Sequence, residues 1–346
     1  MARVAITGAT GHLGSSLIRQ LIARGDEVRA LVREPGAPEP LQGLPIELVR
    51  GDLITGDGLD TLLDGVEVVY HLAAQISIVG PMNGLVDAVN VGGVRNVVAA
   101  ARRAQVRRMV HTCSVHVFEP EPFDVPTDET RPRVRRGHAP AYDVSKADGE
   151  VIVRDAVADG FDAVIVHPSA VMGPFDFRPS RMGHVLIKLY RRRLPGMFDG
   201  GFDFVDARDV SAGMIAAAER GRAGESYILT GHYRHLRDFA KMAAAITGVA
   251  APRLEAPVWL ANLGAPFMDV AARVLQGEPL YTSESLMPLR LRCAYDHGKA
   301  ARELGYSIRP LEDTLRDAYA WMLARGVLTP KTESTHALTH HAVTAT

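Results

Sequence analysis

Short apolar runs alternate with amphipathic segments between residues 4 and 169. The runs are rich in Val, Ile and Leu, which is typical of strands buried in a parallel sheet. The segments between them carry apolar residues at the spacing of a helix that packs on one face. This alternation predicts an α/β fold with a doubly wound parallel sheet. The predicted strands lie near residues 4–7, 27–32, 45–53, 66–74, 108–114 and 163–169, and the predicted helices include 15–24, 90–101 and 142–159.

The regular alternation ends after residue 169, where Gly-Pro and Arg-Pro pairs interrupt the chain. A short strand, a helix and another strand follow within residues 203–231. We therefore expect the sheet domain to span 1–170 and to be completed by about 203–231. Residues 171–202 and 232–330 would form a smaller C-terminal lobe. The pattern further predicts helices at 235–247, 258–275 and 311–325, and a disordered tail over the polar, aperiodic residues 331–346.

Three glycines follow the first predicted strand at three-residue intervals, namely Gly8, Gly11 and Gly14. Gly8 permits a tight turn, Gly11 lets the backbone approach a pyrophosphate, and Gly14 lets the helix lie against the strand. The free N–H groups at the start of the helix then face the anion. A glycine turn between a strand and a helix therefore predicts a Rossmann-type dinucleotide site.

Composition limits the class of partner and the compartment. The chain has 346 residues and a formal net charge of −1, which favours no nucleic acid or other polyanion. Its only cysteines, Cys113 and Cys293, form no metal-ligand pattern, and their low number suits a reducing compartment. The first predicted strand begins too early for a signal peptide, and no apolar run is long enough to span a bilayer. We expect a cytoplasmic protein without a metal or a membrane contact.

Tyr142 and Lys146 lie four residues apart on a predicted helix, so their side chains share one face. Such a pair is common by chance, and by itself it indicates only a surface pair. Here it follows a nucleotide-binding turn and a fifth strand that ends in Ser114. The order and spacing of these three residues indicate a catalytic group.

The chain resembles the extended short-chain dehydrogenase/reductase family. The resemblance rests on Thr7–Gly14, on Ser114 with the Tyr142-x-x-x-Lys146 pair, and on Pro168-Ser169 with Gly173-Pro174. The last segment is similar to dihydroflavonol reductase-like and 3β-hydroxysteroid dehydrogenase-like members of the NAD-dependent epimerase/dehydratase family. The resemblance implies that Tyr142 is the general acid/base, that Lys146 holds the nicotinamide ribose and favours the phenolate, and that Ser114 bonds the substrate oxygen.

The end of the second predicted strand bears on the choice of cofactor. Val32 occupies the place where an acidic residue would bind the ribose of NAD, and Arg33 follows it. Arg33 favours the 2′-phosphate of NADP, although Glu34 could fold inward and bind the ribose, so NAD stays possible. The resemblance implies a cofactor site made by Thr7, Gly8, Thr10, Gly11, His12, Leu13, Gly14, Arg33, Asp52, Leu53, Ala73, Ala74, Tyr142, Lys146, Pro168 and Ser169.

These observations predict an NADP-dependent oxidoreductase that interconverts a carbonyl and a secondary alcohol on a moderately hydrophobic small molecule. We expect substrate contacts from Gln75, His116, Met172 and Phe175. His116 departs from the family pattern, which leaves the identity of the substrate open.

Two other functions remain possible. One is a nucleotide-sugar or hopanoid-type sugar epimerase/dehydratase with tightly bound NAD(P), for which Arg178, Arg181 and residues 191–193 could hold a diphosphate. The other is a redox-sensing binding protein that has lost catalysis, against which the intact Ser114, Tyr142 and Lys146 argue. The resemblance also implies a possible homodimer, because members of the family often pair the helices that correspond to 90–103 and 142–159.

Two further segments have predicted roles around this site. Asn90 is unfavourable inside a helix, which indicates a structural or a water-holding hydrogen bond. Residues 119–141 form a long irregular segment that we expect to border the active site.

Overall fold

The computed structural model describes residues 1–34, 36, 38–194, 196–256 and 294–341. Its centre is a parallel sheet of seven strands in the order β10-β6-β5-β4-β1-β2-β3. Reversal of the strand order beside β1 is the mark of a doubly wound Rossmann sheet, which confirms the predicted fold class. The strands are β1 Arg3–Thr7, β2 Glu27–Val32, β3 Glu47–Arg50, β4 Val68–His71, β5 Arg108–Thr112, β6 Ala163–Pro168 and β10 Ser226–Leu229.

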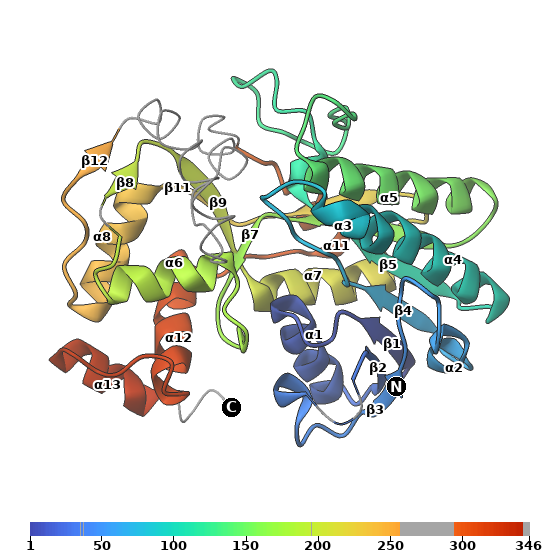
Figure 1. Cartoon of the computed structure of the whole chain (residues 1–346), viewed down its shortest axis with the longest axis horizontal. Helices are drawn as coiled ribbons and strands as arrows, with labels where there is room; N and C mark the ends of the chain where they lie inside the picture. Colours follow the sequence, from blue (N-terminus) through green and yellow to red (C-terminus); the bar gives the residue numbers. More distant parts are fainter. Residues whose placement is uncertain (35, 37, 195, 257–293, 342–346) are drawn as a thin grey trace.

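Helices cover both faces of this sheet (Figure 1). Side chains alternate along a strand, so Val4 and Ile6 of β1 pack with one set of helices and Ala5 packs with the other. The first face is covered by α1 His12–Ala23, α7 Ala207–Arg220 and α11 Gly298–Leu304, and the second by α2 Leu59–Leu63, α4 Gly93–Arg103 and α5 Ala141–Ala158. Short helical turns connect these elements at η1 Glu39–Leu41, η2 Met82–Gly84, α3 Leu85–Asp87, η3 Ala88–Gly92 and η4 Val115–Val117.

A second, smaller body lies beside the carboxyl end of the sheet, at the left of Figure 1. It has its own core, in which Phe204, Phe239 and Tyr319 are almost wholly buried. Its sheet has the order β11-β9-β7. Residues 203–231 are therefore divided, since β9 belongs to this small sheet whereas α7 and β10 complete the large one. The elements are β7 Ala170–Met172, α6 Arg181–Tyr190, β8 Met197–Phe198, β9 Gly201–Asp206, β11 His232–His235, α8 Leu236–Thr247, β12 Glu255–Ala256 and α12 Leu311–Ala324.

The prediction of a disordered tail is wrong for residues 333–341, which form α13 (Glu333–His341). Thr335 and Leu338 of this helix are buried, and the Thr332 hydroxyl donates to the Thr247 carbonyl at 2.6 Å. The segment is too polar to show a periodic hydrophobic pattern. It is held by capping and tertiary contacts that cannot be predicted from the local sequence. The helix predicted at 258–275 lies outside the described residues.

The long segment 119–141 is tied down by arginine side chains. Arg131 is 7% exposed and donates to the carbonyls of Pro122 and Val125 at 3.1 and 3.0 Å. Arg133 stacks over the Phe118 ring at 4.3 Å. These contacts hold the segment in one conformation beside the large cavity described next.

Candidate functional site

A single cavity of about 1630 Å³ runs between the carboxyl edge of the large sheet and the smaller lobe. The glycine turn and the ends of β2, β3, β4 and β5 line one part, and α6 with the strands of the small lobe lines the other. Residues 119–120 and 138–140 of the long irregular segment also border it, as the sequence predicts. A pocket at this edge, where the strand order reverses, is the usual ligand site of such a sheet.

The glycine turn has the close packing that its spacing predicts. Gly8 has φ +77°, and a Cβ there would lie 2.6 Å from the Ala73 nitrogen. A Cβ at Gly14 would lie 2.2 Å from the Gly8 carbonyl oxygen, so only glycine lets α1 approach the turn. Gly11 differs, because its Cβ would meet only that same oxygen, at 3.3 Å. Its outer side faces the cavity.

All but one of the predicted cofactor residues line this cavity. The exception is Thr7, which is fully buried below the turn. Its hydroxyl lies 2.6 Å from Nδ1 of His71 and accepts a hydrogen bond from the Ala73 backbone. Thr7 therefore joins β1 to the end of β4 and supports the turn from beneath.

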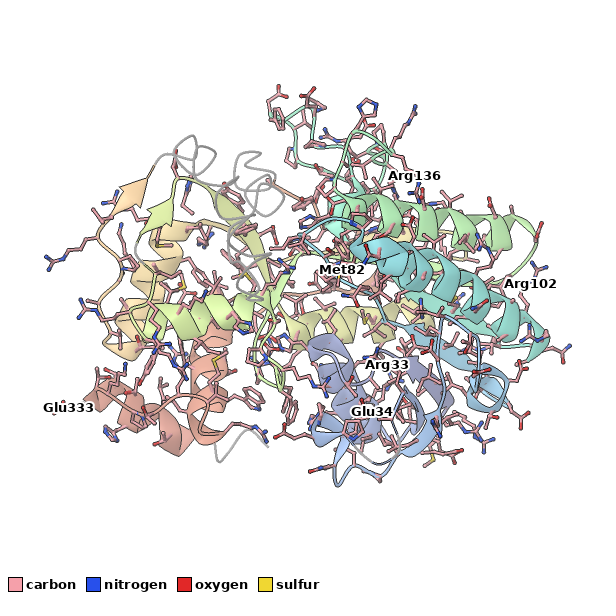
Figure 2. All side chains as sticks on the ribbon, viewed as in Figure 1. Arg33, Glu34, Met82, Arg102, Arg136 and Glu333 are labelled. Atoms are coloured by element: carbon pink, nitrogen blue, oxygen red, sulfur yellow. The ribbon has the colours of Figure 1, made fainter. Side chains whose placement is uncertain are left out.

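Arg33 and Glu34 are both exposed where β2 ends (Figure 2). Both line the cavity. Asp52 lies across from them after β3, and its Oδ1 accepts from the Ile54 backbone at 2.6 Å. This part of the cavity can surround the adenosine end of a dinucleotide, with a guanidinium at its rim.

His12 is held by the neighbouring lobe. Its Nε2 lies 2.9 Å from the Pro174 carbonyl oxygen, and its Nδ1 lies 4.0 Å from Asp176. Only 8% of the side chain is exposed. His12 therefore links the glycine turn to the segment after β7, and its ring does not project freely toward a phosphate.

Ser114, Tyr142 and Lys146 meet at the inner part of the cavity. Ser114 precedes η4, and its Oγ accepts from the His116 backbone at 3.2 Å. Burial raises the pKa of Tyr142, and a hydrogen bond with Ser114 and the charge of Arg181 offset this only in part. The phenol is therefore protonated at neutral pH in the protein alone. It can donate a proton.

Lys146 lies one helical turn after Tyr142 on α5 and is 2% exposed. Its ammonium donates to the Thr112 carbonyl at 2.6 Å, at the end of β5. Burial lowers the pKa of Lys146. This hydrogen bond fixes the direction of the side chain along the cavity wall.

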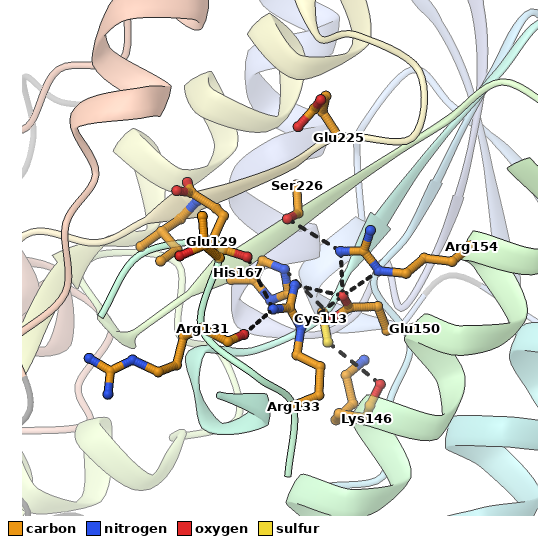
Figure 3. A network of polar contacts seen from close by, with 12 residues as sticks. Cys113, Glu129, Arg131, Arg133, Lys146, Glu150, Arg154, His167, Glu225 and Ser226 are labelled. Atoms are coloured by element: carbon orange, nitrogen blue, oxygen red, sulfur yellow. Dashed lines mark hydrogen bonds and ion pairs between the residues drawn. The ribbon is translucent and has the colours of Figure 1, made fainter. Parts of the chain in front are cut away.

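A buried ionic cluster lies next to Lys146 (Figure 3) and contacts the Ser114 backbone through His167. Glu150 is 1% exposed, and its Oε1 accepts from Arg133 and Arg154 at 3.0 and 2.8 Å. Burial alone would raise the pKa of Glu150, but the surrounding positive groups outweigh it and hold it at about 2. His167 lies beside Glu150 and contacts the Ser114 carbonyl oxygen at 3.2 Å through Nδ1. The cluster thus supports the backbone of Ser114.

The same cluster includes a group with metal-ligand geometry, formed by Cys113, Glu150 and His167. Burial raises the pKa of the Cys113 thiol, which opposes the thiolate that binds metals. Two arginines already compensate Glu150. These three residues therefore fit a buried structural cluster better than a metal-binding site.

Asn90 has the structural role that its position predicts. It lies in the π-helical turn η3 and is 1% exposed. Its Oδ1 accepts from the Gln75 backbone at 2.7 Å, and its Nδ2 donates to the Gln75 carbonyl at 3.0 Å and to the Ser145 hydroxyl at 2.9 Å. Asn90 thereby ties the segment after β4 to α5.

The four expected substrate contacts divide into two pairs. Gln75 and His116 line the cavity, whereas Met172 and Phe175 are not among its lining residues. Met172 is 1% exposed and packs in the core of the small lobe. The Phe175 ring lies under the Arg19 guanidinium at 4.7 Å. Neither of these two side chains borders the cavity, because their positions after β6 do not specify which way the chain turns.

Several lobe residues line the cavity in addition to the four expected substrate contacts. Arg181, His184 and Lys188 line it from α6, and Phe202 and Leu236 line it from β9 and α8. Among these, the sequence indicates only Arg181, as a diphosphate contact in the epimerase alternative; the only signal for His184 and Lys188 is their spacing along one helix face.

Comparison with known proteins identifies the family of this chain. The family model described as "NAD dependent epimerase/dehydratase family" matches residues 4–230. The chain belongs to this family. Membership confirms the resemblance found in the sequence and indicates NAD(P)-dependent oxidoreductase or epimerase-type chemistry. None of the helices in the described ranges has the length and apolar content that crossing a bilayer requires.

Proteins with several different names are similar to this chain along nearly its whole length. Sterol demethylase protein B of Methylococcus capsulatus is 36% identical and covers 93% of this chain and 99% of its own. A putative dihydroflavonol 4-reductase of Synechocystis is 33% identical, with 93% and 94% covered. The crystal structure of gox2253 superposes with a TM-score of 0.83 at 32% identity and covers 95% and 100%.

Proposed function

We propose that this protein is an NADP-dependent oxidoreductase that interconverts a carbonyl and a secondary alcohol on a moderately hydrophobic small molecule. The observation that carries the proposal is the meeting of Tyr142, Ser114 and Lys146 in the cavity that the glycine turn opens. The epimerase/dehydratase family and the reductase-type names of its members support it.

The cofactor supplies the hydride, and this chain's residues position the substrate and move the proton. The Ser114 hydroxyl, beside Tyr142, orients the substrate oxygen. Burial keeps the Tyr142 phenol protonated, so it can give its proton to the oxygen during reduction. Lys146 is aligned by the Thr112 carbonyl and would hold the nicotinamide ribose. In oxidation the Tyr142 phenolate takes the proton back.

Replacement of Tyr142 by Phe tests the chemical step. The ring still packs, so NADPH affinity should stay within about twofold, while turnover should fall by about 10²–10⁴-fold, the usual value of general acid–base catalysis. Turnover is measured as the loss of NADPH absorbance with a panel of aromatic and alicyclic ketones. NADPH affinity is measured by fluorescence titration. Turnover within about tenfold of the parent would indicate another proton donor.

The preference for NADP rests on Arg33, which is exposed at the cavity rim. A hydrogen bond to a charged group contributes about 1.5–3 kcal/mol, or roughly 10–150-fold in affinity, and exposure favours the lower end. Arg33→Ala should therefore lower NADP affinity by about tenfold and leave NAD affinity nearly unchanged. Titration of both cofactors measures this, and an unchanged ratio would show that Arg33 does not select between them.

An epimerase or dehydratase with tightly bound NAD(P) is the second candidate. The basic residues Arg178, Arg181 and Lys188 favour it, because they line the cavity and could hold a diphosphate. The two functions differ in cofactor use, since an epimerase recycles its cofactor. Epimerisation of a nucleotide sugar without added cofactor, together with no ketone turnover, would reverse the ranking.

A further inference from the structure

A histidine and a carboxylate stand beside the proposed proton donor, and the reaction described above does not use them. His116 follows Ser114 in the turn η4, and Asp143 follows Tyr142 on α5. The Ser114 Oγ accepts from the His116 backbone at 3.2 Å, which ties His116 to the hydroxyl proposed to orient the substrate oxygen. All four residues line the cavity. The pair of His116 and Asp143 therefore lies at the reacting end of the proposed site.

The ion pair determines which nitrogen of His116 can act as a base. Its Nδ1 lies 3.4 Å from Oδ1 of Asp143. A carboxylate at this nitrogen favours the tautomer with the proton on Nδ1, which leaves the lone pair on Nε2. Burial and the charge of Arg181 would lower the pKa of His116, but the hydrogen bond and the charge of Asp143 outweigh them and raise it. Such an imidazole can both take and return a proton near neutral pH.

The imidazole of His116 is accessible from the cavity. Its side chain is 38% exposed, and its ring stands edge-on to the ring of Tyr142 with their centres 6.5 Å apart. In the proposed function, Ser114 and Tyr142 bind the oxygen of a ketone. The carbon next to the carbonyl is then only two bonds from that oxygen. His116 therefore stands beside the part of the substrate that carries the hydrogens of this carbon.

We propose that His116, held by Asp143, is a second catalytic acid–base group, which removes and returns a proton on the carbon next to the substrate carbonyl. The inference rests on the proposed function, since it adds a second reaction to the same site. The C–H bond breaks, and its proton passes to Nε2 of His116. Its electron pair forms a carbon–carbon double bond, and the carbonyl electrons move onto the oxygen, where the Tyr142 and Ser114 hydroxyls stabilise the enolate. Return of the proton from Nε2 reverses each change, so no oxidant or reductant is consumed.

The small lobe contributes an apolar wall to the cavity, which includes Val185, Leu194, Met197, Phe202 and Leu236. Such a wall favours a hydrocarbon body beside the carbonyl. A ketone with an apolar ring and with hydrogens on the carbon next to its carbonyl therefore suits this site. α-Tetralone has both features and is the probe for the test.

Deuterium exchange measures the proton step without hydride transfer. α-Tetralone is incubated in D₂O with the protein and oxidised NADP, which has no hydride to give, and NMR follows the hydrogens next to the carbonyl. The parent should exchange them at least about 100-fold faster than buffer, and His116→Gln should lower the rate by about 10²–10⁴-fold, the usual value of general acid–base catalysis. Asp143→Asn should lower the rate by about tenfold or more, because the amide no longer holds the required tautomer of His116.

Two controls separate a chemical role of His116 from a structural one. His336→Gln is the matched control, because His336 is exposed on α13 and is not among the residues that line the cavity in the described structure. Added imidazole should restore exchange to His116→Ala, since a free base can replace a missing general base but not a side chain that only shapes the cavity. Fluorescence titration with NADPH verifies that each variant keeps its fold.

Exchange by the parent that is lost in His116→Gln and regained with imidazole in His116→Ala supports the inference, even if no ketone consumes NADPH and the redox proposal fails. Exchange by the parent no faster than in buffer would overturn the inference. An unchanged rate in His116→Gln, an equal loss in His336→Gln, or a lack of rescue by imidazole would also overturn it.

Discussion

Two glycines of the turn are expected to have different roles: Gly14 is required for packing of α1, whereas Gly11 is required for cofactor binding. An added Cβ at Gly14 would lie 2.2 Å from the Gly8 carbonyl oxygen and 2.8 Å from the Ala9 Cα, both of them backbone atoms. α1 would have to move, which costs about 1–3 kcal/mol for overpacking of this kind. An added Cβ at Gly11 meets only the Gly8 oxygen at 3.3 Å, and Gly11 has an ordinary φ of −76°.

Gly14→Ala should therefore lower both the stability of the protein without cofactor and its cofactor affinity. Gly11→Ala should change the free energy of unfolding by no more than about 1 kcal/mol. Alanine restricts the unfolded chain, which stabilises the fold and offsets the close contact of its Cβ with the Gly8 oxygen at 3.3 Å. Its methyl group would occupy the place where a pyrophosphate approaches the turn. A clash of about 1–3 kcal/mol lowers cofactor affinity by about 5–150-fold.

Urea unfolding of the protein without cofactor and fluorescence titration with NADPH measure the two quantities separately. Gly92→Ala is the control, because Gly92 lies in a helical turn with φ −60° and open space around its Cβ. It should leave affinity unchanged and raise stability by up to about 1 kcal/mol. If Gly11→Ala binds NADPH within twofold of the parent, no pyrophosphate approaches this glycine and the reasoning is refuted.

Two further predictions concern buried charges. Lys146→Met should weaken NADPH binding and slow turnover by about tenfold or more each, because the ammonium aligned by Thr112 is lost. If a titration shows unchanged NADPH affinity, Lys146 does not hold the ribose. Glu150 has a pKa of about 2 when folded, below its ordinary 4.5, so it stabilises the fold fully above pH 4.5 and loses this contribution as the pH falls toward 2. Urea unfolding should show that Glu150→Gln has a free energy of unfolding lower than that of the parent by on the order of 3 kcal/mol at pH 7. This difference should narrow below pH 4.5. A difference that does not depend on pH would contradict the ionic role of Glu150.

The sequence by itself determined the parts of this protein whose cause is local. The apolar run of β1, the glycine spacing and the start of α1 lie within about twenty residues, and glycine permits the positive φ at Gly8 and the close approach at Gly14 that this turn requires. The helical spacing of Tyr142 and Lys146 places both on one face whatever surrounds them. The parallel sheet follows from the alternation of buried strands and amphipathic helices.

Only the tertiary structure decided which distant side chains share the cavity. Met172 and Phe175 turn away from it, and His12 bonds Pro174, because the path of the chain after β6 depends on how the small lobe packs. The polar segment of α13 becomes a helix through contacts with α8 that leave no periodic signal. Arg181 and Tyr142 line the same cavity for the same reason, because their relative positions are set by the packing of two separate cores, which no local pattern encodes.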